Sequence, residues 1–324
     1  MGIGIVAVGS NLPDIVVDNA ELSKSLDTSD EWIASRTGIR SRRIAPQGVF
    51  SSDLGIAAVR DLQERYPDAL SGIDLIICCT GTPDAHFPST GAIIGHGVGL
   101  SRVPAFDLSA ACSGFVHGLN VVRALISSGQ HKKVLLIGTE TLSRIVDWQD
   151  RNTAILFGDG AGAVVLEEVP SPYGIVASFM GGDGSGGPLL YAMDIADRLS
   201  GVGACSPKLT QNGREVFKFA VRTVPEAILE TLDRAGLTPD RLDLLIPHQA
   251  NIRIIESAMD RLGLPLERAV INIDRCGNTS SASIPIALSE AVAQGRLHKG
   301  NHVAMIGFGG GLSWSTALFK WYER

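Results

Sequence analysis

The stretch "GIDLIICC" (residues 72–79) has a second copy later in the chain, "RLDLLIPH" (241–248). Downstream of each come a helix-like run, a Gly-Leu pair and an apolar strand that ends in an aspartate, Asp107 in the first case and Asp274 in the second. A turn of small residues, a helix that ends in glycine and another apolar strand follow in both. Such self-similarity predicts an internal duplication, with chance similarity between two α/β units as the alternative.

Short apolar runs alternate with helix-like stretches along the whole chain. The strand-like runs are Ile3–Val8, Leu75–Cys79, Val134–Ile137, Ala161–Leu166, Leu244–Ile246 and His302–Ile306. The helix-like stretches are Ser51–Arg65, Phe115–Ser127, Glu215–Ala235 and Asn251–Leu262. This alternation predicts an α/β fold in which helices cover both faces of a largely parallel sheet.

Composition excludes several classes of protein. With 45% hydrophobic and 19% charged residues in 324, the chain has the composition of a globular protein, and its net charge of −6 argues against a general nucleic-acid binder. Five cysteines, an odd number, indicate a reducing compartment. The first residues, "MGIGIVAVGSNLP", have the pattern of a strand and not of a signal peptide, and no apolar run approaches the roughly 20 residues that span a bilayer. We therefore expect a cytoplasmic protein with no membrane and no nucleic-acid partner.

One thiol, Cys112, stands at a predicted strand-to-helix junction in "DLSAACSGFVHGL" (107–119). A helix N-terminus stabilises a thiolate, so the position predicts a lowered pKa for Cys112. The small residues on either side would let a substrate carbonyl approach the backbone closely. The alternative is a buried structural cysteine, which is the role that Cys78 and Cys79 fit inside an apolar strand.

Two polar residues in the second half are candidates for the same chemistry. His248 follows a predicted strand, at the strand end where α/β proteins normally bind ligands, although a lone histidine is more often structural. Asn278 lies in "CGNTSSAS" (276–283), a turn in which asparagine usually binds its own backbone. Cys276, in the same turn, is a rival thiol.

The duplication connects two of these candidates. Counted back from the helix-ending Gly129 and Gly295, Cys112 and Asn278 both lie 17 residues upstream. If the duplication is real, these two residues occupy related positions near a pseudo-two-fold axis and share one central site. The glycine run in "FGGGLSWS" (308–315) could direct backbone N–H groups at an oxyanion there, or form a plain tight turn.

The segment "DTSDEWIASRTGIRSRR" (27–43) has the pattern of a capped helix. Thr28 and Glu31 fit a capping box, and Gly38 fits a helix stop. Trp32 and Arg36 are four residues apart and therefore share one helix face. This pair could stack on an aromatic base and hold phosphates, or form a core tryptophan beside a solvated arginine.

The sequence contains no convincing motif for binding a dinucleotide, a metal ion or a nucleoside triphosphate. "GDGSGG" (182–187) and "GDGAGA" (158–163) match a dinucleotide-binding pattern, but neither opens a helix in a βαβ unit. The chain has no H-E-x-x-H, no paired C-x-x-C and no P-loop lysine motif. We therefore expect no metal site.

Together, eight stretches resemble the β-ketoacyl-acyl-carrier-protein synthase III family, thiolase-fold condensing enzymes that start type II fatty-acid synthesis. They are "DTSDEWIASRTGIRSRR" (27–43), "HFPST" (86–90), "AACSGF" (110–115), "DRNTAILFGDGAGA" (150–163), "NGREVFKFAV" (212–221), "PHQANIRII" (247–255), "DRCGNTSSASIP" (274–285) and "GFGGG" (307–311). The resemblance covers nearly the whole chain. It implies a thiolase-like α/β fold of two duplicated βαβαβ-type halves, residues 1–170 and 171–324, packed as a layered α-β-α-β-α core.

The resemblance also implies residue roles. Cys112 is similar to the nucleophile that accepts the acyl group, and His248 and Asn278 complete a Cys-His-Asn set. Gly310 is similar to the residue whose N–H joins that of Cys112 in the oxyanion hole. The other residues carried over are Thr28, Trp32, Arg36 and Arg151 at the adenine and phosphates of coenzyme A, Gly213, Phe217, Ala250, Asn251 and Phe308 along the pantetheine tunnel and substrate, Phe87 in the acyl pocket of a partner subunit, and Arg253, Arg214 and Lys218 at the carrier-protein surface.

The implied reaction is a decarboxylative Claisen condensation of a short acyl-CoA, acetyl-CoA first, with malonyl-acyl carrier protein, performed by a homodimer without a cofactor. Glu256 and Asp260 depart from the basic patch that meets the acidic carrier protein, so docking is expected to be weaker or shifted. Residues 191–211, with Cys205, match the family poorly and leave the length of the primer open. The alternatives are a paralogue of secondary metabolism with an unusual starter, a cysteine acyltransferase or thioesterase without condensation, and a non-catalytic acyl-CoA-binding protein.

Overall fold

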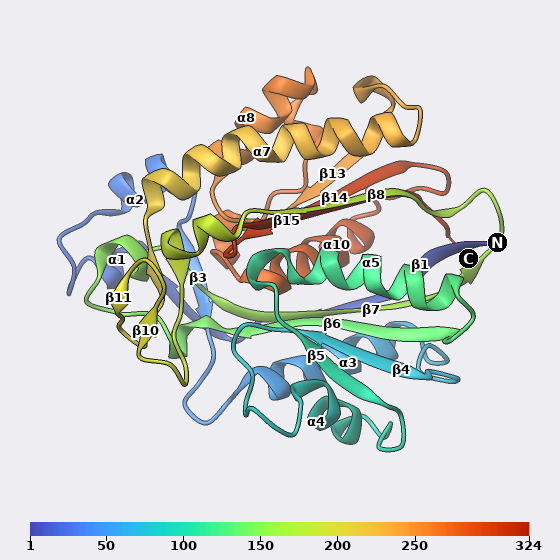
Figure 1. Cartoon of the computed structure of the whole chain (residues 1–324), viewed down its shortest axis with the longest axis horizontal. Helices are drawn as coiled ribbons and strands as arrows, with labels where there is room; N and C mark the ends of the chain where they lie inside the picture. The colour runs from blue at the N-terminus through green and yellow to red at the C-terminus, as the bar shows by residue number, and fades with distance from the viewer. Residues whose placement is uncertain (324) are drawn as a thin grey trace.

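The computed structural model describes residues 1–323, and its core stacks two β-sheets between layers of helices (Figure 1). The first sheet has the strand order β1-β7-β6-β4-β5: β1 (Gly2–Asn11), β7 (Asp159–Val169), β6 (Lys133–Thr141), β4 (Leu75–Cys79) and β5 (Ala105–Leu108). The second has the order β8-β15-β14-β13: β8 (Gly174–Gly182), β15 (Ser313–Lys320), β14 (His302–Gly309) and β13 (Leu244–Pro247). The six predicted strand-like runs all lie in these strands.

The two sheets repeat one topology. In each, the first two pairs of strands in this order are antiparallel and the next is parallel. The first sheet ends in the parallel pair β4–β5, and its counterpart in the second sheet is a single parallel bridge between Leu245 and Ala269. The expected largely parallel arrangement is therefore confirmed except at one strand of each sheet, β7 and β15, which runs opposite to all the others. Each of these two runs back beside the preceding strand and needs no crossover helix there.

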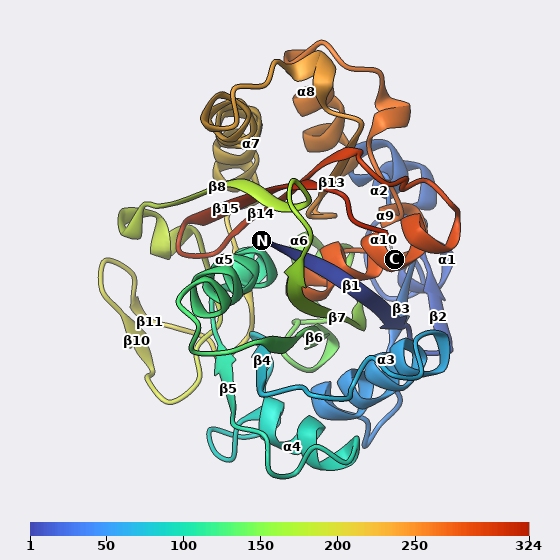
Figure 2. The same cartoon turned by 90° about the vertical axis from the view of Figure 1, so that its right-hand side faces the viewer.

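Three helix layers enclose the sheets. On the outer faces lie α3 (Ser51–Arg65) and α4 (Thr90–Gly97) against the first sheet, and α7 (Gly213–Arg234), with α8 (Ile252–Leu262) packed beside it, against the second. Figure 2 shows α5 (Gly114–Ser127) and α10 (Ser283–Ala293) between the sheets. Because each central helix contacts a sheet on both sides, α10 is buried almost along its whole length.

Short elements complete the chain around this core. They are β2 (Ile15–Asp18), α1 (Asn19–Leu22), α2 (Asp30–Thr37), β3 (Ser41–Ile44), α6 (Arg151–Ala154), β9 (Leu190–Tyr191), β10 (Arg198–Leu199), β11 (Gly203–Ala204), β12 (Thr210–Gln211) and α9 (Ile273–Cys276). Residues 1–323 also contain six 3₁₀ turns: η1 (Ala111–Ser113), η2 (Leu142–Arg144), η3 (Gly184–Leu189), η4 (Pro239–Arg241), η5 (Leu266–Arg268) and η6 (Ser280–Ala282).

Two local predictions need correction. The expected strand before Asp274 does not form, since Ile273–Cys276 is the short helix α9. The expected capping box of Thr28 and Glu31 is also absent, because α2 begins one residue later and the Ser29 hydroxyl accepts from the Trp32 N–H at 3.1 Å. The predicted stop of this helix at Gly38, with φ 81°, is confirmed.

The predicted duplication is confirmed at the level of the fold, but it pairs different residues. Ala111 and Ser280 share a left-handed backbone, with φ of 45° and 48°, and each opens a 3₁₀ turn that leads into a central helix. Counting forward from these two residues, the counterpart of Cys112 is Ser281 and not Asn278. The count backward from the helix ends failed because α10 is three residues shorter than α5 (11 against 14 residues).

The division of the chain at residues 170 and 171 stays a prediction; it falls in the turn between β7 and β8. The two halves share one apolar core, to which α5 and α10 both contribute. Among the helices of residues 1–323, none has the length and apolar composition that crossing a bilayer requires.

Candidate active site

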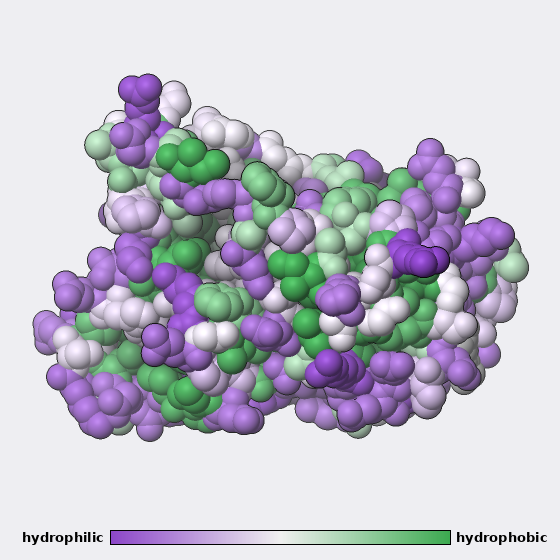
Figure 3. All heavy atoms as spheres, turned by 90° about the horizontal axis from the view of Figure 1, so that it is seen from below, coloured by the Kyte–Doolittle hydropathy of each residue, from purple (hydrophilic) through white to green (hydrophobic). Residues whose placement is uncertain are grey.

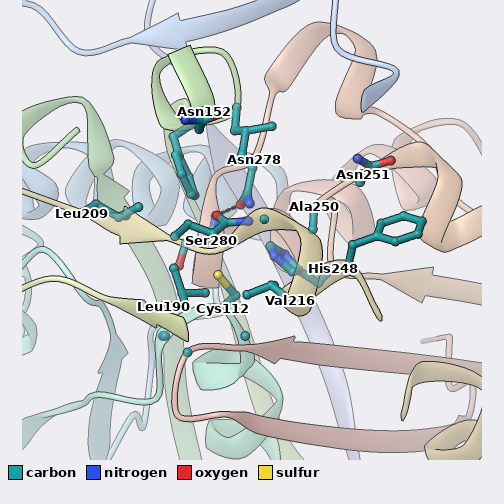
Figure 4. A pocket seen from close by; sticks show the side chains of 18 of the residues that line it. Cys112, Asn152, Leu190, Leu209, Val216, His248, Ala250, Asn251, Asn278 and Ser280 are labelled. Atoms are coloured by element: carbon teal, nitrogen blue, oxygen red, sulfur yellow. Dashed lines mark hydrogen bonds between the residues drawn. The ribbon is translucent and has the colours of Figure 1, made fainter. Parts of the chain in front are cut away.

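One cavity of about 790 Å³ collects side chains from both halves of the chain. Cys112, His248 and Asn278 all line it, and Figure 4 shows the three side chains turned toward one another. They come from the starts of two central helices and from the end of β13, which meet because the two halves repeat one topology. All three side chains are nearly buried, with exposed fractions of 7%, 1% and 6% respectively.

Tight backbone contacts position Cys112. It lies in η1, directly between β5 and α5, and the preceding Ala111 adopts the left-handed backbone described above. The end of β14 passes directly over the thiol: a Cβ added to Gly309 would lie 2.8 Å from the Cys112 Cβ and 3.2 Å from its Sγ. Glycine is therefore required at this position of "GFGGG".

Burial determines the resting state of the thiol. It raises the pKa of Cys112 to about 12, while a hydrogen bond from Ser280 lowers the pKa. The expectation of a lowered pKa is therefore wrong for the free protein. Residues Ala111–Ser113 form a 3₁₀ turn ahead of α5, and loss of solvation outweighs the helix terminus.

His248 is a neutral imidazole in this site. Burial lowers its pKa to about 3, its Nδ1 lies 2.7 Å from the Ser283 hydroxyl, and its ring meets Phe308 edge-on with 5.1 Å between centroids. The residue follows β13, and its backbone N–H donates to the carbonyl of Ile306 on β14. The ring is thus held by contacts on two sides.

Asn278 is fixed through its backbone and its side chain. Its N–H donates to the Leu156 carbonyl at 2.8 Å, and its own carbonyl accepts from the Gly158 N–H at 3.0 Å. The side-chain Oδ1 accepts from the Ser280 N–H at 2.9 Å, drawn dashed in Figure 4. With Oδ1 occupied in this way, the Nδ2 amide group is the part of the side chain that can donate to a ligand.

The predicted coenzyme A residues gather at Trp32 on α2. The guanidinium of Arg36 lies 4.6 Å from the Trp32 ring centroid and that of Arg151 lies 4.9 Å away. Trp32 and Arg36 line the cavity, whereas Arg151 does not and instead binds the Asp27 carbonyl at 2.7 Å. Thr28 also lies outside the lining, and its buried hydroxyl has no hydrogen-bond partner among the described residues 1–323.

The other residues that the resemblance singled out fall into two groups. The residues that line the cavity are Gly213, Phe217, Ala250, Asn251, Phe308 and Gly310, with the basic Arg214, Lys218 and Arg253. The side chains of these three basic residues are exposed, and the Arg253 guanidinium stacks 5.1 Å from the Phe217 ring. Phe87 is not among the lining residues; it is 86% exposed on the loop between β4 and α4.

Several lining residues were missed from the sequence. The pairing of β9 with β12 brings Leu190 and Leu209 to the cavity, and Tyr191 and Ala192 follow. These come from the region that has no counterpart in the quoted motifs, so only the tertiary structure reveals them. Further apolar lining comes from Leu142, Ile145, Ile155, Leu156 and Phe157. Cys205 lies outside the lining.

Two other residues at the site, Ser280 and Ser283, could have been predicted from the sequence. Ser280 and Ser283 belong to the polar run after Asn278, and such a run at the start of a buried helix needs a polar partner. Across residues 1–323, no group of three or more His, Cys, Asp or Glu side chains is arranged to hold a metal ion.

Comparison with known proteins agrees with this arrangement. Residues 106–184 match the family described as 3-oxoacyl-[acyl-carrier-protein (ACP)] synthase III, and residues 232–321 match its C-terminal family. The chain is 55% identical to β-ketoacyl-[acyl-carrier-protein] synthase III 2 of Deinococcus radiodurans over 321 residues, 99% of this chain and 95% of that one.

Solved structures give the same result. The synthase III of Thermus thermophilus superposes with a TM-score of 0.96 at 49% identity, covering 98% of this chain and 99% of that one. The priming β-ketosynthase of the R1128 polyketide pathway superposes with 0.91 at 38%, covering 99% and 96%. These matches confirm the predicted thiolase-like fold. The chain therefore belongs to the β-ketoacyl-[acyl-carrier-protein] synthase III family, and it is a condensing acyltransferase.

Proposed function

We propose that this chain condenses a short acyl-CoA, acetyl-CoA first, with malonyl-acyl carrier protein through an acyl thioester on Cys112. The observation that carries the proposal is the convergence of Cys112, His248 and Asn278 at one cavity built by both halves. A buried thiol beside two neutral hydrogen-bond donors suits an acyl acceptor followed by an enolate, and it suits neither metal-assisted hydrolysis nor hydride transfer.

In the first half of the reaction, the Cys112 sulfur attacks the thioester carbonyl of acyl-CoA. The tetrahedral oxyanion is stabilised by the backbone N–H groups of Cys112 and Gly310, each worth roughly 3–4 kcal/mol in sites of this kind. The C–S bond to coenzyme A then breaks. The thiol proton of Cys112 leaves with coenzyme A, and the acyl group stays on the enzyme.

In the second half, malonyl-acyl carrier protein occupies the site that coenzyme A has left. Its carboxylate departs as carbon dioxide, and the electron pair moves onto the thioester oxygen as an enolate. His248 and Asn278 donate hydrogen bonds to that oxygen. The α-carbon then attacks the acyl-Cys112 carbonyl, the β-ketoacyl thioester leaves, and the sulfur takes a proton from solvent.

We propose that coenzyme A lies in the cavity with its adenine end at Trp32 and its thioester end near Cys112. Trp32 and Arg36 supply an aromatic face and a cation at the outer end of the cavity, which suit an adenine and its phosphates. We propose that Arg151 and Thr28 contact the adenine and phosphates from the edge of this site. Gly213, Phe217, Ala250, Asn251 and Phe308 line the way toward the thiol. Leu190, Leu209 and Phe157 are apolar walls that fit a short acyl chain.

We propose that the carrier protein docks at the exposed Arg214, Lys218 and Arg253. Their positive charge matches an acidic partner, although Lys218 is paired with Glu215 at 2.7 Å, which reduces its share. Glu256 and Asp260 are exposed on α8 nearby and oppose such a partner.

The working unit is proposed to be a homodimer. Phe87 is 86% exposed and Phe106 on β5 is 40% exposed, and β5 is an edge strand with one side open to pairing. Figure 3, seen from the side on which α4 and β5 lie, shows apolar side chains gathered in patches on that face. A second copy would cover them and would bring Phe87 to the acyl pocket of its partner.

We propose that the reaction needs no resident cofactor, because the thiol, imidazole, amide and backbone groups named above suffice for each step. A reducing cytoplasm fits the five free cysteines, of which Cys78, Cys79, Cys112 and Cys276 are buried. The net charge of −6 does not favour nucleic acid, and we expect no membrane partner.

Intact-protein mass spectrometry tests the proposal. After incubation with a panel of acyl-CoAs, the wild type should gain one acyl group, which Cys112→Ala should lose and the matched variant Cys276→Ala should keep. Addition of malonyl-acyl carrier protein should discharge the label as a β-ketoacyl thioester. Acylation without a condensed product would leave an acyltransferase, and preference for an unusual starter would favour the role of the polyketide priming relative.

A further inference from the structure

The duplicated fold contains a second copy of the nucleophile position, which Ser281 occupies, and a buried acid faces it. In the second half, Gly307 packs on Ser113, and Gly309, two residues later, lies over Cys112. In the first half, a Cβ on Gly138 would lie 2.6 Å from the Ser281 carbonyl, and the residue two positions later is Glu140. Glu140 thus faces Ser281 where glycine faces the thiol.

Glu140 is enclosed completely. Its exposed fraction is 0%, and none of the ion pairs within residues 1–323 includes it. The Thr82 hydroxyl donates to Oε2 at 2.7 Å, and the Gly81 N–H lies 3.1 and 3.2 Å from the two carboxyl oxygens. An ionised carboxyl without a cation is costly at such a position.

The two short contacts of the Ser281 hydroxyl indicate whether Glu140 is protonated. The Ser281 Oγ lies 2.8 Å from the Cys79 carbonyl and 2.8 Å from Glu140 Oε1. A hydroxyl has one hydrogen, and a backbone carbonyl only accepts. The Ser281 hydrogen therefore goes to Cys79, and the second short contact is satisfied when Glu140 carries a proton on Oε1 and donates it to Ser281.

From this geometry we propose that Glu140 is a protonated positioning residue, whose carboxylic acid holds Ser281 and thereby fixes the turn that orients Asn278. Ser281 follows Ser280, whose N–H binds Asn278 Oδ1 and whose side chain lies beside both Cys112 and Glu140. Ser280 also has a left-handed backbone, with φ of 48°, which needs support from its neighbours. Burial raises the pKa of Glu140 and so also favours its protonated form.

Difference infrared spectroscopy tests the protonation. The wild type minus Glu140→Gln spectrum should contain the carbonyl stretch of a protonated carboxylic acid, and Ser281→Ala should shift this band. Asp159→Asn is the matched control: Asp159 is equally buried, but the Ser143 hydroxyl can give its one hydrogen to Asp159 Oδ2 at 2.6 Å, and the positive charge of Arg144 favours the ionised form, so no acid band is expected. Absence of an acid band in the Glu140 difference spectrum would overturn the proposal.

Kinetics test the positioning, which rests on the role of Asn278 proposed above. Glu140→Ala should lower decarboxylation of malonyl-acyl carrier protein about tenfold while changing acylation of Cys112 much less, because Asn278 acts in the second half-reaction. Glu140→Gln should recover most of that loss, since its amide N–H₂ can replace the acid O–H toward Ser281. Equal loss in both half-reactions, or no recovery by glutamine, would overturn the positioning role.

The two measurements separate the failure of this inference from failure of the proposed function. If wild-type protein forms no acyl-Cys112, or forms it without condensation, the function proposed above is wrong while the infrared band still reports on Glu140. Thermal unfolding of each variant checks the fold. If Glu140→Ala does not fold, Glu140→Asp serves in its place: its shorter acid cannot reach Ser281, so it should lose decarboxylation selectively, and wild-type rates would overturn the positioning role.

Discussion

The Nδ1 atom of His248 lies 2.7 Å from the hydroxyl of Ser283, the first residue of α10. The Ser283 oxygen also accepts from the Gln249 N–H at 3.4 Å, and among the hydrogen bonds of residues 1–323 the Ser283 hydroxyl has no acceptor other than Nδ1, so we assign its hydrogen to Nδ1. The imidazole proton is then on Nε2. This tautomer gives His248 the N–H that an enolate oxygen needs.

Ser283→Ala should therefore impair the second half-reaction. Without its partner, Nδ1 no longer fixes the tautomer, and malonyl decarboxylation should fall about fivefold to tenfold while acylation of Cys112 stays near the wild-type rate. Single-turnover kinetics of the two half-reactions measure this. Ser289→Ala, a buried serine further along α10, is the control. Equal effects of both variants would contradict the assignment.

His248 should make the protein sensitive to acid. In the folded state its pKa is about 3, against about 6.5 in the unfolded chain, so below pH 6.5 the unfolded state binds the additional proton and stability falls as pH decreases. Between pH 7 and pH 5 this one group should cost about 2 kcal/mol of unfolding free energy. Urea unfolding of the wild type and His248→Gln at both pH values measures the difference. Parallel pH dependence in the two proteins would contradict it.

The resting thiol should react slowly. Because burial raises the pKa of Cys112 to about 12, its alkylation by iodoacetamide should rise about tenfold per pH unit between pH 7 and 9 without reaching a plateau. Cys205, which is partly exposed, is the internal comparison in the same peptide map. A plateau for Cys112 below pH 8 would mean that the terminus of α5 outweighs burial.

Gly309→Ala should crowd the Cys112 thiol and impair its acylation. The added methyl would lie 2.8 Å from the Cys112 Cβ, so the strand or the thiol must shift; we expect acylation to fall by at least tenfold and stability by about 1–3 kcal/mol. Gly184→Ala is the control, because nothing lies within 4 Å of the Cβ that it would add. If Gly309→Ala is acylated at the same rate as the wild type, β14 can move away from the thiol.

Charge reversal at Arg253 should affect the carrier protein alone. Arg253→Glu should raise KM for malonyl-acyl carrier protein about tenfold, more at low salt, with little change in acylation by acyl-CoA. Arg60→Glu, an exposed arginine on α3 at the opposite layer, is the matched control. If both variants behave alike, docking takes place elsewhere.

Most of the core could be predicted from the sequence because local patterns are strong there. The apolar run Leu75–Cys79 and the helix Ser51–Arg65 were predicted with the bounds that the structure has. The direction of neighbouring strands could not be predicted in this way, since an antiparallel β7 or β15 has the same apolar pattern as a parallel one. Nor could the lining from Leu190 and Leu209, which reach the cavity through the pairing of β9 with β12.

What the sequence determined by itself is the repeated order of strands and helices and the residue types at their junctions, among them Cys112, His248 and Asn278. Tertiary structure alone decided their environment. It made Ser281 the counterpart of Cys112, enclosed Glu140 without a cation, and replaced the expected acidic thiol with one whose pKa is raised. The physical reason is that solvation and hydrogen-bond partners depend on which segments meet in space, and local sequence carries no record of that meeting.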